Sequence, residues 1–151
     1  MARFLSVKLA PLLLILITGF TIFSSSASAA SVQITTFTDT TKESTTTVPK
    51  NYHHFYSSKD TVKVTFKVDQ WIKTKNIKKV NVILEKDTGL WWSTKATKSV
   101  TSTTPLTFSV NAGKGDYRLV VYDEGEPTGY DKAPLYYAKS TKYNVNVIGL
   151  D

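Results

Sequence analysis

Hydrophobic and polar residues alternate along most of the chain after residue 30. The clearest case is TVKVTFKVD, residues 61–69, where one face carries Val62, Val64, Phe66 and Val68. Lysine and threonine occupy the positions between them. Because successive residues of a strand point to opposite faces of a sheet, this period of two predicts a strand that is buried on one side only.

The same period recurs in five further segments, which are residues 31–37, 79–85, 106–110, 116–122 and 142–148. From residue 79 onward, glycine, asparagine, aspartate and proline fall between the segments, as expected of turns. Outside the first 30 residues, no window of ten or more residues keeps a helical period. The pattern therefore predicts an all-β domain, a single antiparallel β-sandwich of about six to eight short strands.

One stretch of this pattern resembles a known group of folds. TPLTFSVNAGKGDYRLVVYD, residues 104–123, resembles the late-strand hairpin of immunoglobulin-like and fibronectin-type sandwiches, in which a glycine-bearing turn precedes a tyrosine that opens an alternating strand. The resemblance implies that the hydroxyl of Tyr117 ties the start of its strand to the preceding turn. It implies a fold and no functional residue, and the chain lacks the cysteines of antibody-type domains.

The first 29 residues have the organisation of a secretory signal peptide. Arg3 and Lys8 form a basic region, residues 9–23 are apolar, and Ala27 and Ala29 fit the small-residue cleavage pattern. The apolar run is shorter than the roughly 20 residues that a spanning helix needs. We therefore expect a secreted, extracellular protein, free or loosely associated with the cell wall, with no membrane span in its mature form.

The mature chain divides into two expected parts. Residues 30–50 are rich in threonine, with eight threonines among residues 35–47, and we expect either a flexible arm or an edge strand there. Residues 51–151 form the predicted sandwich domain. Because the chain has no cysteine, we expect a domain without disulfides and without the cysteine-linked anchor of a lipoprotein.

Basic residues are concentrated in the middle of the chain. Residues 42–114 hold 13 lysines and five acidic residues, whereas residues 115–151 hold four basic and six acidic residues. The net charge is +7 for the whole chain, and loss of Arg3 and Lys8 with the signal peptide leaves +5. A basic face of this kind favours salt-sensitive contacts with polyanions. The alternative is a solvated surface that only keeps the protein in solution.

The histidines match no catalytic or metal-binding motif. His53 and His54 are the only ones, and as neighbours on a strand they point to opposite faces, so they would not chelate one ion together. No G-x-S-x-G motif accompanies them. We therefore expect no enzyme activity and no cofactor.

Acidic residues cluster in one predicted loop. The stretch YDEGEPTGYD contains Asp123, Glu124, Glu126 and Asp131, and its glycines would allow the oxygen atoms to converge on calcium. The spacing does not match that of an EF-hand loop. We favour a solvated loop with no metal, and calcium binding is the alternative.

The adjacent residues Trp91 and Trp92 are candidates for a binding surface. If residues 90–95 form a strand, the two indole rings face opposite ways and at most one reaches the core. The other ring would stand among lysines, where Trp71 and nearby aromatic residues would extend a platform for sugar stacking or hydrophobic anchoring. The alternative is that the second ring covers the end of the sandwich or packs under the N-terminal arm.

These features favour a secreted, non-enzymatic binding module. Its expected partner is an anionic cell-wall polymer or a polysaccharide, and the contacting residues are Lys63, Lys67, Trp71, Trp91 and Trp92. The alternative is a secreted protein-interaction factor, namely an inhibitor, an antimicrobial or immunity-type factor, or a biofilm component, whose partner is another protein.

We predict that the mature protein begins at Ala30 or Ser31 and accumulates in the culture medium, because the cleavage pattern ends at Ala29 or Ala30. N-terminal sequencing of secreted material checks this prediction. Recovery of Met1 in a membrane fraction would contradict it.

Overall fold

The computed structural model describes residues 30–41, 48–72, 79–123, 126–128, 135–137 and 141–151, with the backbone alone for 126–128 and 135–137. The elements in these residues are all β-strands. In chain order they are β1 (Val32–Thr40), β2 (Asn51–Ser57), β3 (Thr61–Trp71), β4 (Val80–Asp87), β5 (Trp92–Val100), β6 (Leu106–Asn111), β7 (Gly115–Asp123), β8 (Glu126–Thr128), β9 (Leu135–Tyr137) and β10 (Thr141–Leu150).

The expected signal peptide, residues 1–29, lies outside the described residues. Within the part of the chain that the structure describes, no helix is long and apolar enough to cross a membrane.

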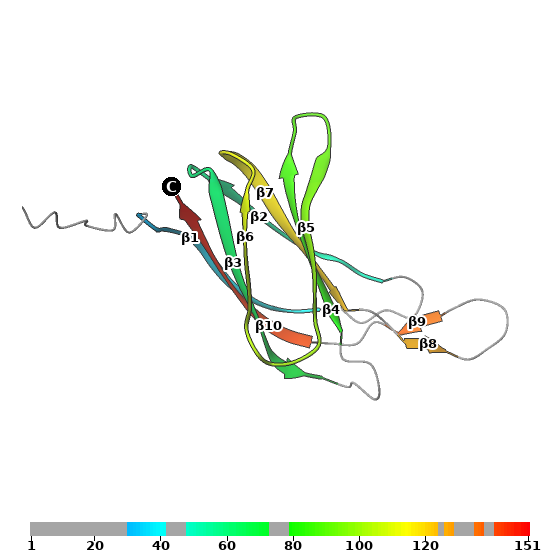
Figure 1. Cartoon of the computed structure of the whole chain (residues 1–151). Coiled ribbons are helices and arrows are strands. Elements are labelled where there is room, and N and C mark those ends of the chain that lie inside the picture. Colours follow the sequence, from blue (N-terminus) through cyan, green and yellow to red (C-terminus); the bar gives the residue numbers. More distant parts are fainter. Residues whose placement is uncertain (1–29, 42–47, 73–78, 124–125, 129–134, 138–140) are drawn as a thin grey trace, which may run out of the picture.

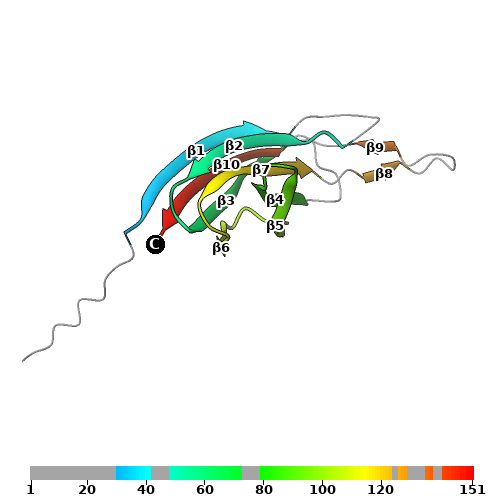
Figure 2. The ribbon, with the colours of Figure 1, turned by 90° about the horizontal axis from the view of Figure 1, so that it is seen from above.

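Eight of the strands form two four-stranded antiparallel sheets that pack face to face (Figures 1 and 2). The first sheet has the strand order β1-β10-β3-β6 and the second has the order β2-β7-β4-β5. Strands β8 and β9 form a separate hairpin. The prediction of an all-β, antiparallel sandwich is therefore confirmed.

The strands of the sandwich pair in a nested order. β1 pairs with β10, β2 with β7, β3 with β6 and β4 with β5, as in one long hairpin whose tip lies between β4 and β5. Pairing of β10 with β3 and of β4 with β7 then completes the two sheets. This wrapped hairpin is the arrangement of a jelly roll. The immunoglobulin-like resemblance holds only at the level of a two-sheet sandwich, because immunoglobulin-type domains place their first and last strands in different sheets.

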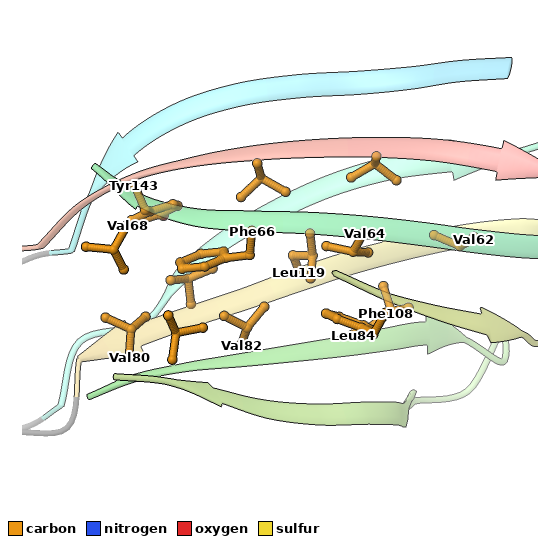
Figure 3. Packing of buried hydrophobic residues seen from close by; sticks show 14 of the residues in the cluster. Val62, Val64, Phe66, Val68, Val80, Val82, Leu84, Phe108, Leu119 and Tyr143 are labelled. Carbon is orange, nitrogen blue, oxygen red and sulfur yellow. The ribbon is translucent and has the colours of Figure 1, made fainter. Parts of the chain in front are cut away.

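The hydrophobic core lies between the inner faces of the two sheets (Figure 3). From β3, four side chains have no exposed surface, namely Val62, Val64, Phe66 and Val68. The neighbouring strands β6 and β10 of the same sheet and the facing strands β4 and β7 contribute Val80, Val82, Leu84, Phe108, Tyr117, Leu119, Val121, Tyr143, Val145 and Val147. These are positions that the alternation predicted to face inward, so the assignment of strand faces is confirmed. Valine is frequent among them because β-branched side chains pack well on a pleated surface.

The turn between β6 and β7 is fastened to the body of the sandwich. The hydroxyl of Tyr117 donates a hydrogen bond to the carbonyl oxygen of Gly113, as the resemblance implied. Lys86 reaches the same turn, and its Nζ donates to the carbonyl oxygen of Ala112 at 2.5 Å. A Cβ atom on Gly115 would lie 3.2 Å from Lys86 Cε, and Gly115 has a φ of 141°. Glycine is therefore favoured there by both backbone conformation and the space that the lysine occupies.

The threonine-rich N-terminal segment contributes an edge strand in its described part. β1 lies at the edge of the first sheet, and its register with β10 shifts between Gln33 and Thr35. Such a bulge re-aims the side chains that follow it. Ile34 and Phe37 pack against the core, whereas Val32, which precedes the bulge, is 43% exposed.

We predict that Phe66→Ala or Leu119→Ala lowers the free energy of unfolding by about 2–5 kcal/mol, because each deletion leaves a cavity in a fully buried layer. Denaturant unfolding measures the change. The control is Lys67→Ala on the solvent face of β3, which should change stability by less than about 0.5 kcal/mol. Similar small effects in all three variants would mean that the strand faces are assigned wrongly.

Candidate functional site

The outer face of the second sheet collects aromatic and planar side chains. On the edge strand β2, Tyr52, His54 and Tyr56 are exposed and alternate with residues that face the first sheet. The register places His54 beside Arg118 of β7, and Arg118 beside Glu85 of β4. The alternation of each strand therefore turns these side chains away from the core and onto one surface.

Trp92, the first residue of β5, extends this surface. Its ring lies 4.3 Å from the guanidinium of Arg118 and 5.2 Å from the ring of His54. The same guanidinium lies 5.0 Å from the ring of Tyr52. Because β4 and β7 separate β5 from β2, the indole reaches over β4 and lies across the sheet. We call the surface made by Tyr52, His54, Tyr56, Trp92 and Arg118 the aromatic face.

An ion pair holds the guanidinium of the aromatic face in place. Arg118 Nε donates to Glu85 Oε2 at 2.6 Å, and the two side chains are 22% and 15% exposed. A charge-assisted hydrogen bond at this distance, together with ring contacts, restricts the orientation of the arginine. Tyr52 and Tyr56 are 49% and 59% exposed. The face therefore combines an ordered centre with aromatic rings whose surfaces are open to a ligand.

The two adjacent tryptophans occupy different settings, and neither belongs to the buried core. Trp92 is half-buried on the aromatic face, whereas Trp91 is 62% exposed in the turn before β5. The expectation of a strand over residues 90–95 holds only from Trp92 onward. A turn removes Leu90 and Trp91 from the pleat, so strand alternation does not set their directions.

The other three predicted binding residues lie away from the aromatic face. Lys63 and Lys67 are on the solvent side of β3 in the first sheet, which is the opposite side of the sandwich (Figure 2). Lys67 Nζ lies 3.6 Å from Asp69 Oδ1. Trp71, at the end of β3, packs partly against the core. The structure therefore does not bring the predicted lysines and tryptophans together in one site.

Sequence reasoning missed Arg118 and His54 as partners of Trp92, and Glu85 as the partner of Arg118. One signal was available, because Arg118 is the only arginine after residue 3 and sits on the polar side of a predicted strand. Arginine is the cation that stacks most readily on aromatic rings. The partnership itself depends on the register of four strands, which local patterns do not contain.

A second polar cluster lies between the sheets, where the edge strands β1 and β2 approach each other. His53 Nε2 lies 2.7 Å from the hydroxyl oxygen of Tyr143. Asn51 Nδ2 donates to Asp39 Oδ2 at 2.9 Å. The His53 ring stacks on Phe37, with ring centroids 3.9 Å apart. Because these residues come from β1, β2 and β10, the cluster ties the edges of the two sheets together.

The ionisation of this cluster favours a structural role. Burial lowers the pKa of His53 below its ordinary value of 6.5, and the carboxylate of Asp39 opposes this effect more weakly. Burial also raises the pKa of Tyr143. Both groups are therefore neutral near pH 7 and can share one hydrogen bond. The group of Asn51 that faces Asp39 is an N–H donor and not a carbonyl oxygen. Because a metal ion needs a lone pair from its ligand, this orientation suits a hydrogen bond better than metal coordination.

The acidic cluster that suggested calcium is only partly described. Asp123 is 1% exposed, and its Oδ2 accepts a hydrogen bond from Thr141 Oγ1 at 2.6 Å. Glu124 and Asp131 lie outside the described residues, as does the side chain of Glu126. Within the described residues, no three histidine, aspartate or glutamate side chains gather in a way that could hold a metal ion.

No protein-family model matches the chain, and no curated protein matches it. Among solved structures, the chain is similar to one described as "Bacillus endospore appendages form a novel family of disulfide-linked pili". The two chains share 14% sequence identity with a TM-score of 0.36, over 80% of this chain and 93% of that chain. This likeness is too distant to assign a family.

We predict that stability falls as the pH is lowered from about 7 to 5 and that His53 causes part of the fall. The folded-state pKa of His53 lies below the unfolded value of 6.5, so its neutral form is favoured by folding. This contribution is complete above the unfolded pKa and is lost as the pH falls toward the folded pKa. Thermal melts across this range measure it.

His53→Gln should flatten the dependence of the melting temperature on pH. His54→Gln is the matched control, because its side chain lies on the aromatic face and its charge is the smallest of the three influences on the pKa of His53. The control should keep most of the slope of the wild-type protein. An unchanged slope in His53→Gln would rule out this role for the histidine.

Proposed function

We propose that the protein is a secreted, non-enzymatic binding domain that holds cell-wall polysaccharide against the aromatic face. The observation that carries the proposal is the contact of Trp92 with Arg118 and His54 across the second sheet. The core does not require this cluster, because these side chains lie on the side of the sheet that faces away from the first sheet. An ordered cluster of this composition on an open surface is typical of a contact site.

The chemistry of the aromatic face suits a sugar chain. The rings of Tyr52 and Tyr56 offer flat apolar surfaces to the C–H faces of sugar rings. The remaining N–H groups of Arg118 and the ring nitrogens of His54 supply hydrogen-bonding groups for sugar hydroxyls. Tyr52, His54 and Tyr56 follow one strand in two-residue steps of roughly 6.6 Å, and this row suits an extended polymer.

Two of the carboxylates on this side of the sandwich are used in structural contacts, which favours binding over hydrolysis; Asp116, opposite Tyr56, is a further carboxylate on this side. Cleavage of a glycosidic bond needs two carboxyl groups about 5–10 Å apart across a cleft. Glu85 is paired with Arg118, and Asp87 Oδ1 accepts a hydrogen bond from the N–H of Gly89. The carboxylate of Glu85 therefore positions the arginine, and that of Asp87 stabilises the turn.

The lysines of the first sheet support a second candidate function, which is binding to an anionic cell-wall polymer. Lys63 and Lys67 share the solvent face of β3 with Thr65, whose hydroxyl is hydrogen-bonded to that of Thr107 at 3.1 Å. An extended polyanion could contact both ammonium groups along the strand. Because this face and the aromatic face lie on opposite sides of the sandwich, each can be altered without the other.

We predict that Trp92→Ala and Tyr52→Ala each weaken retention on insoluble cell-wall polysaccharide, stripped of anionic polymers, by about tenfold or more, as loss of a central aromatic contact does. Retention isotherms measure the change, and melting temperatures show that each variant is folded. The control is Lys63→Glu with Lys67→Glu, which should leave retention on this resin unchanged.

Intact cell wall distinguishes the two candidate functions. If the lysines bind anionic polymer, their double substitution weakens retention on intact wall, and added salt weakens wild-type retention steeply. If neither aromatic substitution weakens retention on the stripped polysaccharide, the proposed function is wrong. Capture of a discrete protein that remains bound in high salt would favour the protein-interaction alternative instead.

A further inference from the structure

The turn between β4 and β5 presents two large apolar side chains to solvent. Leu90 is 83% exposed and Trp91 is 62% exposed, the highest fractions among large hydrophobic residues in the part of the chain that the structure describes. The hairpin that carries them projects beyond the ends of the neighbouring strands (Figure 1). Neither side chain belongs to the core, and two large apolar side chains exposed side by side make this turn a candidate contact surface.

The turn is ordered by its own hydrogen bonds. The backbone N–H and the hydroxyl of Thr88 both donate to the carbonyl oxygen of Trp91, at 3.0 and 2.8 Å. The N–H of Gly89 donates to Asp87 Oδ1 at 2.7 Å, and Gly89 has a φ of 84°, which favours glycine. The side chains of Leu90 and Trp91 are therefore held outward on a preorganised turn, which lowers the entropic cost of a contact.

The surface made by Leu90 and Trp91 differs from the aromatic face in its chemistry as well as in its position, because it includes an aliphatic side chain. An aliphatic side chain gains little from a hydroxylated sugar ring and gains most from transfer into hydrocarbon. Tryptophan favours the boundary between hydrocarbon and water, where the ring is buried and the indole N–H stays hydrogen-bonded. A leucine beside a tryptophan at the end of a projecting turn therefore matches the chemistry of a membrane interface.

The charges behind the turn complement an anionic lipid surface. Lys86 is held by its hydrogen bond to Ala112 and Glu85 is paired with Arg118. The exposed charges of the β4–β5 hairpin are therefore Lys95 and Lys98 against Asp87. Lys95 and Lys98 are exposed on β5, the strand that leads away from the turn. The adjacent β6–β7 turn adds one charge of each sign, from Lys114 and Asp116, and leaves this balance unchanged.

We propose that the β4–β5 turn is a lipid-contacting anchor, in which Leu90 and Trp91 enter the interface of an anionic membrane and Lys95, the nearer of the two exposed lysines of β5, lies toward the head groups. The contact is shallow and reversible, because two side chains bury much less apolar surface than a spanning helix does. This activity goes beyond polysaccharide binding and uses residues outside the aromatic face, so either activity can fail without the other.

Co-sedimentation of the mature chain with vesicles tests the anchor. Binding is expected to vesicles of phosphatidylcholine mixed with phosphatidylglycerol, and it should weaken with salt and with omission of the anionic lipid. Leu90→Ser with Trp91→Ser should lower the affinity by about tenfold or more. The melting temperature should not change, because both side chains are exposed. The matched control is Tyr56→Ser, which removes a similarly exposed ring from the aromatic face and should bind vesicles as the wild-type protein does.

Quenching of tryptophan fluorescence gives a second readout that does not depend on affinity. Lipids brominated in their acyl chains should quench the wild-type protein, and Trp91→Phe should lose most of that quenching while Trp92→Phe keeps it. No vesicle binding by the wild-type protein, or equal binding by the Leu90 and Trp91 double variant, would overturn the anchor. Loss of polysaccharide retention in that double variant, without any vesicle binding, would assign the turn to the polymer site and would equally overturn it.

Discussion

The structure depends on the burial of one continuous layer of side chains between two sheets that no covalent cross-link joins. The chain has no cysteine, and its core is built largely of valine with a few larger residues such as Phe66, Leu119 and Tyr143. Because strand side chains alternate, most buried residues leave their neighbours on an outer face, with Val120 and Asn81 as buried exceptions. The outer faces of the sandwich are therefore direct consequences of the core, and their residues are free to differ without altering it.

The two outer faces differ in chemistry. The first sheet presents Lys63 and Lys67 among small polar side chains. The second presents Trp92 and Tyr52, whose rings both contact the guanidinium of Arg118. The thickness of the core keeps these surfaces apart, and the β4–β5 turn adds a third surface at the end of the sandwich. One rigid scaffold can thus support independent contacts, with function carried by surface residues that the fold positions.

The two sheets are held together on the side where β1 meets β2 by interactions that differ from those of the core. Here the sheets are joined by hydrogen bonds and ring contacts among His53, Tyr143, Asn51 and Asp39. The strength of this closure depends on the ionisation of a histidine, whereas the strength of the valine core does not. We therefore expect the β1–β2 side of the sandwich to weaken as His53 becomes protonated.

The sequence by itself determined the fold class and the inward faces of β3, β4, β6, β7 and β10, because both follow from the short-range rule of alternation. The tie from Tyr117 to its turn was implied by the resemblance to immunoglobulin-like sandwiches, and β2 was not predicted as a strand. Strand order, and with it the surfaces, was decided only by the tertiary structure. Three features depend on segments that are distant in the chain. They are the pairing of β1 with β10, the contact of Trp92 with Arg118, and the placement of Lys63 and Trp91 on different surfaces. Such pairings depend on the relative energies of alternative registers and topologies, and a local period of two is compatible with many of them.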